Sequence, residues 1–201
     1  MIYLFKNLNK KTICVFVCHT LGGLYKDINI PCKLVYNFYT IKELKKVGKI
    51  FSYPWLCPKN GWKIIHVKYY RQYAQGDELF SKESSYSGYI SEFKPRKNEK
   101  EVIKLLYSSF SAPEFEQELE KHPGSSIFII GYNTPLCVLS TIIEGYHRDY
   151  EMTLLKDASS AKSDGITPEK ERHEILTSVL SSFGKIQTVD EVIAESAKYG
   201  S

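Results

Sequence analysis

The stretch Ser126–Tyr146, SIFIIGYNTPLCVLSTIIEGY, decides the fold of this chain. Its first part, Ile127–Ile130, is a short unbroken apolar run, which is typical of a strand covered on both faces. The run stops at a glycine, a polar elbow follows, and apolar residues resume at helical spacing from Cys137 to Tyr146. The stretch therefore predicts a strand, a turn and a helix, with Cys137 at the helix start.

Similar patterns recur along the rest of the chain. Further unbroken apolar runs are Ile13–Cys18, Ile64–Val67 and Thr153–Leu155. Segments with helical spacing are Thr40–Phe51, Pro113–His122 and Thr167–Phe183, the last opened by TPEKE with Thr167 as expected N-cap. Strands and helices alternate, so we expect an α/β protein, a three-layer α/β/α sandwich around a doubly wound, Rossmann-like parallel sheet.

The length of 201 residues, of which 43% are hydrophobic, suits one domain spanning residues 1–201. The polar, tyrosine-rich segment 69–98 is too short to bury a core of its own, so we interpret it as a surface excursion of that domain. Its tyrosines could stack on nucleobases, but an oligomer interface is the favoured interpretation.

Charge and cysteine content narrow the class of protein. The 27 basic residues are nearly offset by 23 acidic ones, a balance that argues against nucleic acid and membrane partners. No apolar stretch approaches transmembrane length. Five cysteines without CxxC spacing indicate reduced thiols in a cytoplasmic protein. The basic start before ICVFVC imitates a secretion signal, but the run is short and lacks a small-residue cleavage site, so a buried strand is expected there.

Cys137 and Lys104 are the candidate reactive residues. A helix N-terminus favours a thiolate, and its amides can receive an oxyanion, although a free cysteine is commonly just a small core residue. Lys104 follows Val102 and Ile103 at the expected end of a strand. Since the carboxyl ends of parallel strands share one edge, Lys104 could lie near Cys137, whereas a lone lysine is usually a solvated charge.

Together these segments resemble the isochorismatase-like cysteine hydrolases. VIKLLYSSFSAPEF is similar to the family's lysine-bearing strand and its following bend, and GYNTPLCV to its Gly-x-x-Thr-x-x-Cys-Val nucleophile elbow. HEILTSVLSSFGKIQTVDEVI is similar to the closing helix and last strand. The resemblance covers the chain well from Lys100 to Ile193 and only loosely before that.

The resemblance implies a six-stranded parallel sheet with helices on both faces, and a homodimer or larger homo-oligomer. It also implies a Cys, Lys, Asp triad, with Cys137 as the nucleophile and Lys104 as its cationic partner. The oxyanion amides would be those of Asn133 and Cys137, after a cis peptide at Tyr132–Asn133.

The third member of the triad is where this sequence departs from the family. The family's aspartate ends the first strand, and here ICVFVCHT places either Cys18 or His19 there, depending on a one-residue register choice. Neither is a carboxylate. His19 could act as a base for Cys137, or it could be an ordinary polar residue at a strand end.

Metal ligands are also missing from the pattern. Nicotinamidase-type members carry an Asp-x-His cluster after the second strand, whereas this chain continues from IIHV into KYYRQY. We expect no catalytic zinc and no cofactor, and interpret His66 as a core histidine.

Two functions therefore remain open at this point. The first is a divergent relative without hydrolase activity, which serves as a binding or assembly protein and takes a small-molecule ligand. The alternative is a cysteine hydrolase of a small amide, carbamoyl or vinyl-ether compound, in which Cys137 attacks, Lys104 assists and His19 replaces the aspartate. The fold does not choose between them, because function depends on the site.

Overall fold

The computed structural model of the chain describes residues 12–18, 63–70, 82 and 95–199, and the structural statements below concern these residues. They contain one parallel sheet of six strands in the order β3-β2-β1-β4-β5-β6. The strands are β1 Thr12–Cys18, β2 Lys63–Tyr69, β3 Lys100–Lys104, β4 Ser126–Tyr132, β5 Met152–Ser160 and β6 Lys185–Gln187. The expected α/β fold with a parallel sheet is confirmed.

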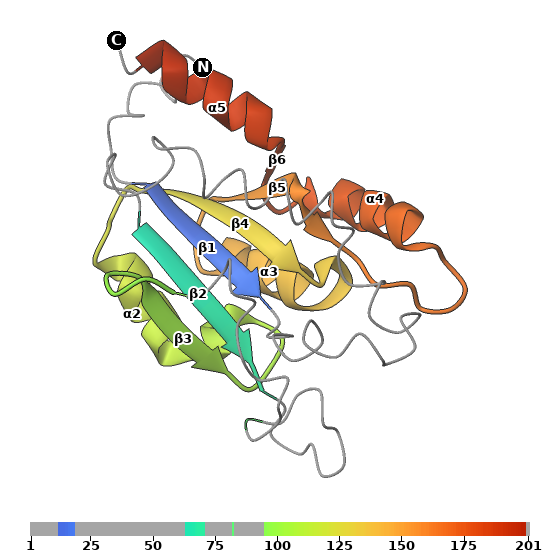
Figure 1. Cartoon of the computed structure of the whole chain (residues 1–201), viewed down its shortest axis with the longest axis horizontal. Helices are drawn as coiled ribbons and strands as arrows, with labels where there is room; N and C mark the ends of the chain where they lie inside the picture. Colours follow the sequence, from blue (N-terminus) through green and yellow to red (C-terminus); the bar gives the residue numbers. More distant parts are fainter. Residues whose placement is uncertain (1–11, 19–62, 71–81, 83–94, 200–201) are drawn as a thin grey trace.

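Four α-helices and two short helical turns accompany the sheet in the described part of the chain. They are η4 Ser109–Ser111, α2 Pro113–Glu120, the π-turn η5 Thr134–Val138, α3 Leu139–His147, α4 Glu169–Leu180 and α5 Val189–Tyr199. From β3 the chain steps to β4, β5 and β6 in one direction across the sheet. Because such crossovers are right-handed, α2, α3 and α4 share one face, and Figure 1 shows α3 running behind β4. The order of strands reverses at β1, next to β4.

The core lies between the sheet and this helical face. Ile129 and Leu154 on the sheet and Phe115 on α2 are fully buried. At Gly145 a Cβ would lie 2.8 Å from the Met152 side chain, so a glycine allows α3 to approach β5 this closely. This close contact packs α3, the helix that follows Cys137, against the sheet.

Some elements differ from the sequence-based expectations. The expected cap at Thr167 is wrong: α4 starts at Glu169 after Pro168, and Thr167 belongs to the preceding turn. The Asp164 carboxylate accepts hydrogen bonds from the N–H groups of Ile166 and Thr167, at 3.0 and 2.8 Å, which holds that turn outside the helix.

Other expectations concern the ends of the chain and the excursion. Helix α5, which the sequence did not predict, contacts β5 and buries Val192. The expected helix Thr40–Phe51 and most of the excursion 69–98 lie outside the described residues. None of the described helices combines the length and the apolar character needed to cross a membrane.

Candidate active site

Cys137 lies in the elbow after β4. The Tyr132–Asn133 peptide is cis, as the resemblance implied, and the π-turn Thr134–Val138 follows it. The Asn133 carbonyl accepts hydrogen bonds from the N–H groups of Leu136 and Val138, at 2.9 and 3.3 Å. The expected strand, turn and helix are therefore present, although a π-turn precedes α3, a feature that is frequent at functional sites. The Cys137 side chain has 0% exposure.

Lys104 ends β3 and is only 1% exposed, so it is not the solvated surface charge that a lone lysine usually is. Its ammonium donates to the Tyr107 carbonyl and lies 5.8 Å from the centroid of the Tyr69 ring. It also forms a side-chain hydrogen bond with Cys137. The reason is positional: Lys104 pairs with Tyr69 at the carboxyl edge of the sheet, where its side chain enters the interior.

Burial dominates the protonation of both groups. It raises the pKa of the Cys137 thiol, while the nearby Lys104 and a hydrogen bond from the Asn133 backbone oppose that rise. It lowers the pKa of Lys104, and Cys137 opposes that shift in turn. Each group thus favours the charged form of the other. The pair can exist as thiol and amine or as thiolate and ammonium, and one proton transfer connects the two.

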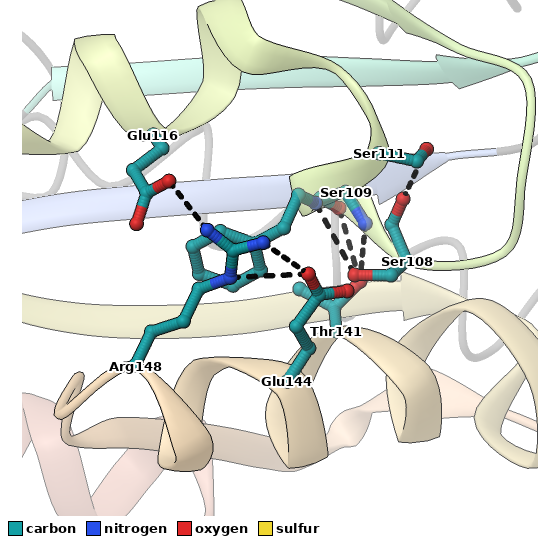
Figure 2. Close-up of polar contacts among 8 residues, drawn as sticks. Ser108, Ser109, Ser111, Glu116, Thr141, Glu144 and Arg148 are labelled. Atoms are coloured by element: carbon teal, nitrogen blue, oxygen red, sulfur yellow. Dashed lines mark hydrogen bonds and ion pairs between the residues drawn. The ribbon is translucent and has the colours of Figure 1, made fainter.

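A series of hydrogen bonds joins the bend after Lys104 to the cysteine, and Figure 2 shows its link between Ser109 and Thr141. The Thr141 hydroxyl donates to the Cys137 carbonyl at 2.7 Å and accepts from the Ser109 N–H at 3.0 Å. The Ser109 hydroxyl lies 3.0 Å from the same oxygen, and because the single Thr141 proton is already committed, Ser109 is the donor. All three residues are fully buried. These hydrogen bonds fix η4 against the first turn of α3. They therefore fix the position of Lys104, which precedes η4, relative to Cys137, which precedes α3.

Arg148 closes the outer side of this arrangement (Figure 2). Its guanidinium contacts Glu116 on α2 at 2.7 Å and Glu144 on α3 at 2.6 and 3.0 Å, and lies 5.0 Å from the centroid of the Phe110 ring. Sequence reasoning missed this group, although the i, i+4 spacing of Glu144 and Arg148 was a usable signal. The contacts join α2, η4 and α3 around the bend.

The position of the family's aspartate is only partly described. Cys18 is the register partner of Lys68, which pairs with Ile103, so Cys18 lies one step before the level of Lys104. His19, the other candidate, lies outside the described residues. The pKa shift of Lys104 arises from burial and from Cys137, with no contribution from a carboxylate of the described residues.

His66 is a buried, partnered histidine of the core, as predicted. It is 1% exposed and its Nε2 lies 2.8 Å from the Glu99 carboxylate. Across the described ranges, no group of three or more His, Cys, Asp or Glu residues is arranged to hold a metal ion.

The stretch of the chain that a family model matches includes this elbow. That model describes the isochorismatase domain and matches residues 56–191. The ureidoacrylate amidohydrolase RutB of Pseudomonas savastanoi pv. phaseolicola is 28% identical over 102 residues, which are 51% of this chain and 40% of that protein. The chain thus matches less than half the length of this relative. The isochorismatase family protein YrdC of Bacillus subtilis is 24% identical over 164 residues, covering 79% of this chain and 85% of YrdC.

Solved structures share the fold. An isochorismatase-like hydrolase from Alkaliphilus metalliredigens has a TM-score of 0.71 at 21% identity, covering 91% of this chain and 98% of that one. A cysteine hydrolase from Pseudomonas syringae pv. phaseolicola has a TM-score of 0.69 at 17% identity, covering 96% and 95%.

Proposed function

The chain belongs to the isochorismatase family, and on that premise we propose that it is a cysteine hydrolase of a small amide or carbamoyl compound. Cys137 is the nucleophile and Lys104 its proton partner. The name of the relative RutB, an amidohydrolase, supports this class of substrate. A vinyl-ether substrate, which the resemblance also allows, has no such support.

The observation that carries the proposal is the buried contact between Lys104 and Cys137. Both side chains are at most 1% exposed, and they are hydrogen-bonded to each other. Burying an amine that can be charged costs several kcal/mol unless it is compensated. A carbonyl, a ring and a thiol compensate an ammonium poorly, so a structural role alone accounts badly for this lysine.

The pair can supply the proton transfers that amide hydrolysis needs. Lys104 takes the Cys137 proton, and the thiolate attacks the carbonyl carbon to give a tetrahedral oxyanion. The Lys104 ammonium then protonates the leaving nitrogen as the C–N bond breaks, which leaves a thioester on Cys137, a released amine product and a neutral Lys104. The Lys104 amine then takes a proton from water as the water oxygen attacks the thioester, and the Cys137 thiolate is expelled as the acid product forms.

The oxyanion would be received by the backbone N–H groups of Asn133 and Cys137, as the resemblance implies. Both residues are buried, and Asn133 already donates toward the cysteine sulfur. Donors fixed in a water-excluded site stabilise a developing charge more than mobile water does.

His19 is proposed as a second base that assists Lys104. Cys18 falls on the level of Ile103, one step before the level of Lys104. This favours His19 over Cys18 as the residue in the place of the family's aspartate.

A second candidate function is a binding or assembly protein that has lost hydrolysis. Two observations favour it: neither Cys18 nor His19 is a carboxylate, and the Cys137 thiol is fully buried with a raised pKa. In that case small amides would bind without being consumed.

The experiment is a screen of small amides and carbamoyl compounds with purified protein. Product formation is compared between the wild type, Cys137→Ala and, as a matched thiol control, Cys32→Ala. Turnover by the wild type and Cys32→Ala, but not by Cys137→Ala, supports the hydrolase. Equal background in all three proteins, together with ligand-induced thermal stabilisation, supports the binding protein instead.

The same screen tests His19. Loss of turnover in His19→Ala, with partial recovery in His19→Asp, supports its role as a base. Unchanged turnover in His19→Ala leaves Lys104 as the base that acts alone.

A further inference from the structure

His173, on α4, bridges the elbow and β5. Its Nδ1 lies 2.8 Å from the Thr134 hydroxyl, and its Nε2 lies 2.8 Å from the Lys156 carbonyl. The Thr134 hydroxyl in turn donates to the Ser160 carbonyl at 2.8 Å. Thr134 has 0% exposure, so this hydroxyl depends on its protein partners. One side chain of α4 therefore reaches both β5 and the first residue of the π-turn.

Counting protons assigns the direction of each bond. The carbonyls of Ser160 and Lys156 can only accept, so Thr134 donates its single proton to Ser160 and Nε2 carries a proton for Lys156. The contact between Nδ1 and Thr134 then needs a proton on Nδ1. When all three bonds form, both ring nitrogens therefore carry a proton, so His173 is an imidazolium and its Nδ1 donates to the threonine oxygen.

The threonine is directly connected to the reactive groups. Thr134 follows Asn133, whose backbone hydrogen bond to Cys137 lowers the pKa of the thiol. The Asn133 side chain is also held, because its Oδ1 accepts from the Lys162 N–H at 3.0 Å. The Asn133 amide therefore sits between two anchored groups, one of which is Thr134.

Helix α4 anchors the other side as well. Arg172, the neighbour of His173, donates from Nη1 to the Lys162 carbonyl at 2.9 Å. Two consecutive residues of α4 thus hold the two neighbours of Asn133: Thr134, which follows it in the sequence, and Lys162, which binds its side chain. A displacement of His173 would be transmitted to the elbow through Thr134.

We propose that His173 is a positioning residue of the active site: by fixing the Thr134 hydroxyl it sets the place of the Asn133 amide beside the Cys137 sulfur. Its effect on hydrolysis rests on the proposed function. Its effect on the reactivity of Cys137 does not, and both are measurable.

Two matched substitutions separate the bonds of the imidazole. In His173→Asn the side-chain amide occupies the place of Nδ1 and can donate to Thr134. In His173→Gln the amide reaches the place of Nε2 and can donate to Lys156. Each variant keeps one donor and loses the other, so their stabilities should be similar.

The primary readout is the rate at which iodoacetamide alkylates Cys137, followed by mass spectrometry of the peptide that contains it. We expect His173→Gln to lower this rate about tenfold, as for the loss of one positioning hydrogen bond, and His173→Asn to stay near the wild type. Equal rates for the two variants, or a lower rate in His173→Asn, overturn the proposal. His147→Asn, at the exposed end of α3, is the control histidine.

A double-mutant cycle adds a second test. In a Thr134→Val background, His173→Gln should have no further effect on the alkylation rate, because the bond it removes is already absent. Additive effects would show that His173 acts by another route. If Thr134→Val does not fold, the comparison of the Asn and Gln variants still decides.

Hydrolysis separates this inference from the proposed function. With an active substrate, His173→Gln should lower kcat and leave KM unchanged, because the Asn133 amide acts on the transition state. If no variant and no wild type hydrolyses any substrate, the hydrolase proposal fails, while the alkylation pattern still tests His173.

Discussion

A basic side chain is buried beside each end of β3, His66 of β2 near its start and Lys104 at its last residue, and the two have different partners. Before the strand, Glu99 lies 2.8 Å from His66 and also accepts from the Arg96 N–H at 2.8 Å. At the end of the strand, Lys104 contacts the Tyr107 carbonyl, the Tyr69 ring and the Cys137 thiol. His66 and Lys104 are each 1% exposed, so burial alone does not distinguish them.

The difference lies in the charge of the partner. Burial lowers the pKa of both bases, and at His66 the Glu99 carboxylate opposes it with a negative charge. At Lys104 the opposing group is a thiol, which becomes negative only when it gives up its proton. The first pair is suited to holding structure. The second is suited to moving a proton, and substitutions at the two ends should separate stability from reactivity.

The largest effect is expected from Lys104→Met. Removing the cation leaves only the Asn133 backbone hydrogen bond to oppose burial at Cys137, so the pKa of the thiol should rise further and its alkylation rate at neutral pH should fall about a hundredfold. The free energy of unfolding should stay the same or increase, because a buried amine is replaced by an apolar side chain of similar length. Alkylation kinetics and urea denaturation measure the two.

The matched control is Lys185→Met, which removes an exposed lysine of β6 whose partner is Glu151. It should change neither the alkylation rate nor the stability substantially. A large loss of stability in Lys104→Met, with the alkylation rate preserved, would make Lys104 a structural residue and erase the contrast.

Glu99→Ala should reverse this pattern. It leaves His66 buried without its carboxylate, and the protein should lose about 3 kcal/mol of unfolding free energy. The alkylation rate of Cys137 should stay near the wild-type value, since Glu99 has no part in its pKa shift. Urea denaturation checks the first statement, and Glu174→Ala, an exposed carboxylate of α4, is the control. A fall in reactivity that parallels the fall in stability would show that the two ends act as one unit.

Much of the structure around Lys104 and Cys137, at the carboxyl edge of the sheet, could be predicted from local sequence. The run IFIIG, the elbow and the helix after Cys137 are contiguous, and the short strand that ends at Lys104 carries the apolar pair Val102 and Ile103 just before the lysine. Local patterns suffice there because a parallel strand and its following helix carry their own periodicities. The cis peptide came from the resemblance, not from periodicity.

The contacts that join these segments could not be predicted in the same way. Ser109 and Thr141 are 32 residues apart, as are Glu116 and Arg148, and His66 and Glu99 are 33 apart. Such pairs depend on how each crossover connection brings the chain back to the sheet, which local sequence patterns do not encode. Lys104 was ambiguous for the same reason, because two of its contacts, Tyr69 on β2 and Cys137 in the π-turn, lie far from it in the sequence.

Thr141→Val tests whether the hydrogen-bond chain supports the carboxyl end. The isosteric change leaves the Ser109 donors and the Cys137 carbonyl without their shared hydroxyl, at a cost of about 2 kcal/mol. The alkylation rate of Cys137 should fall severalfold, less than in Lys104→Met. Thr141→Ser keeps the hydroxyl and should restore most of both quantities. If Thr141→Val alkylates as fast as the wild type, these hydrogen bonds have no role in placing the thiol.

The smallest expected effect is the pH dependence of stability that the His66–Glu99 pair, beside the start of β3, produces. Burial holds the pKa of His66 below its ordinary value of 6.5 despite Glu99. The folded protein therefore binds this proton less readily than the unfolded chain does. His66 contributes stability that is fully present above pH 6.5 and is lost as the pH falls toward its folded pKa, with a slope of at most about 1.4 kcal/mol per pH unit.

His66→Gln removes the titrating group but can still donate to Glu99. Urea denaturation at pH 7.5 and 5.5 should therefore show a larger loss of stability for the wild type than for this variant. Since Glu99 opposes the shift, the difference should be a fraction of the full slope. An equal loss in both proteins would place the acid sensitivity outside this pair, and a larger loss in His66→Gln would mean that the His66 charge is stabilised by Glu99 after all.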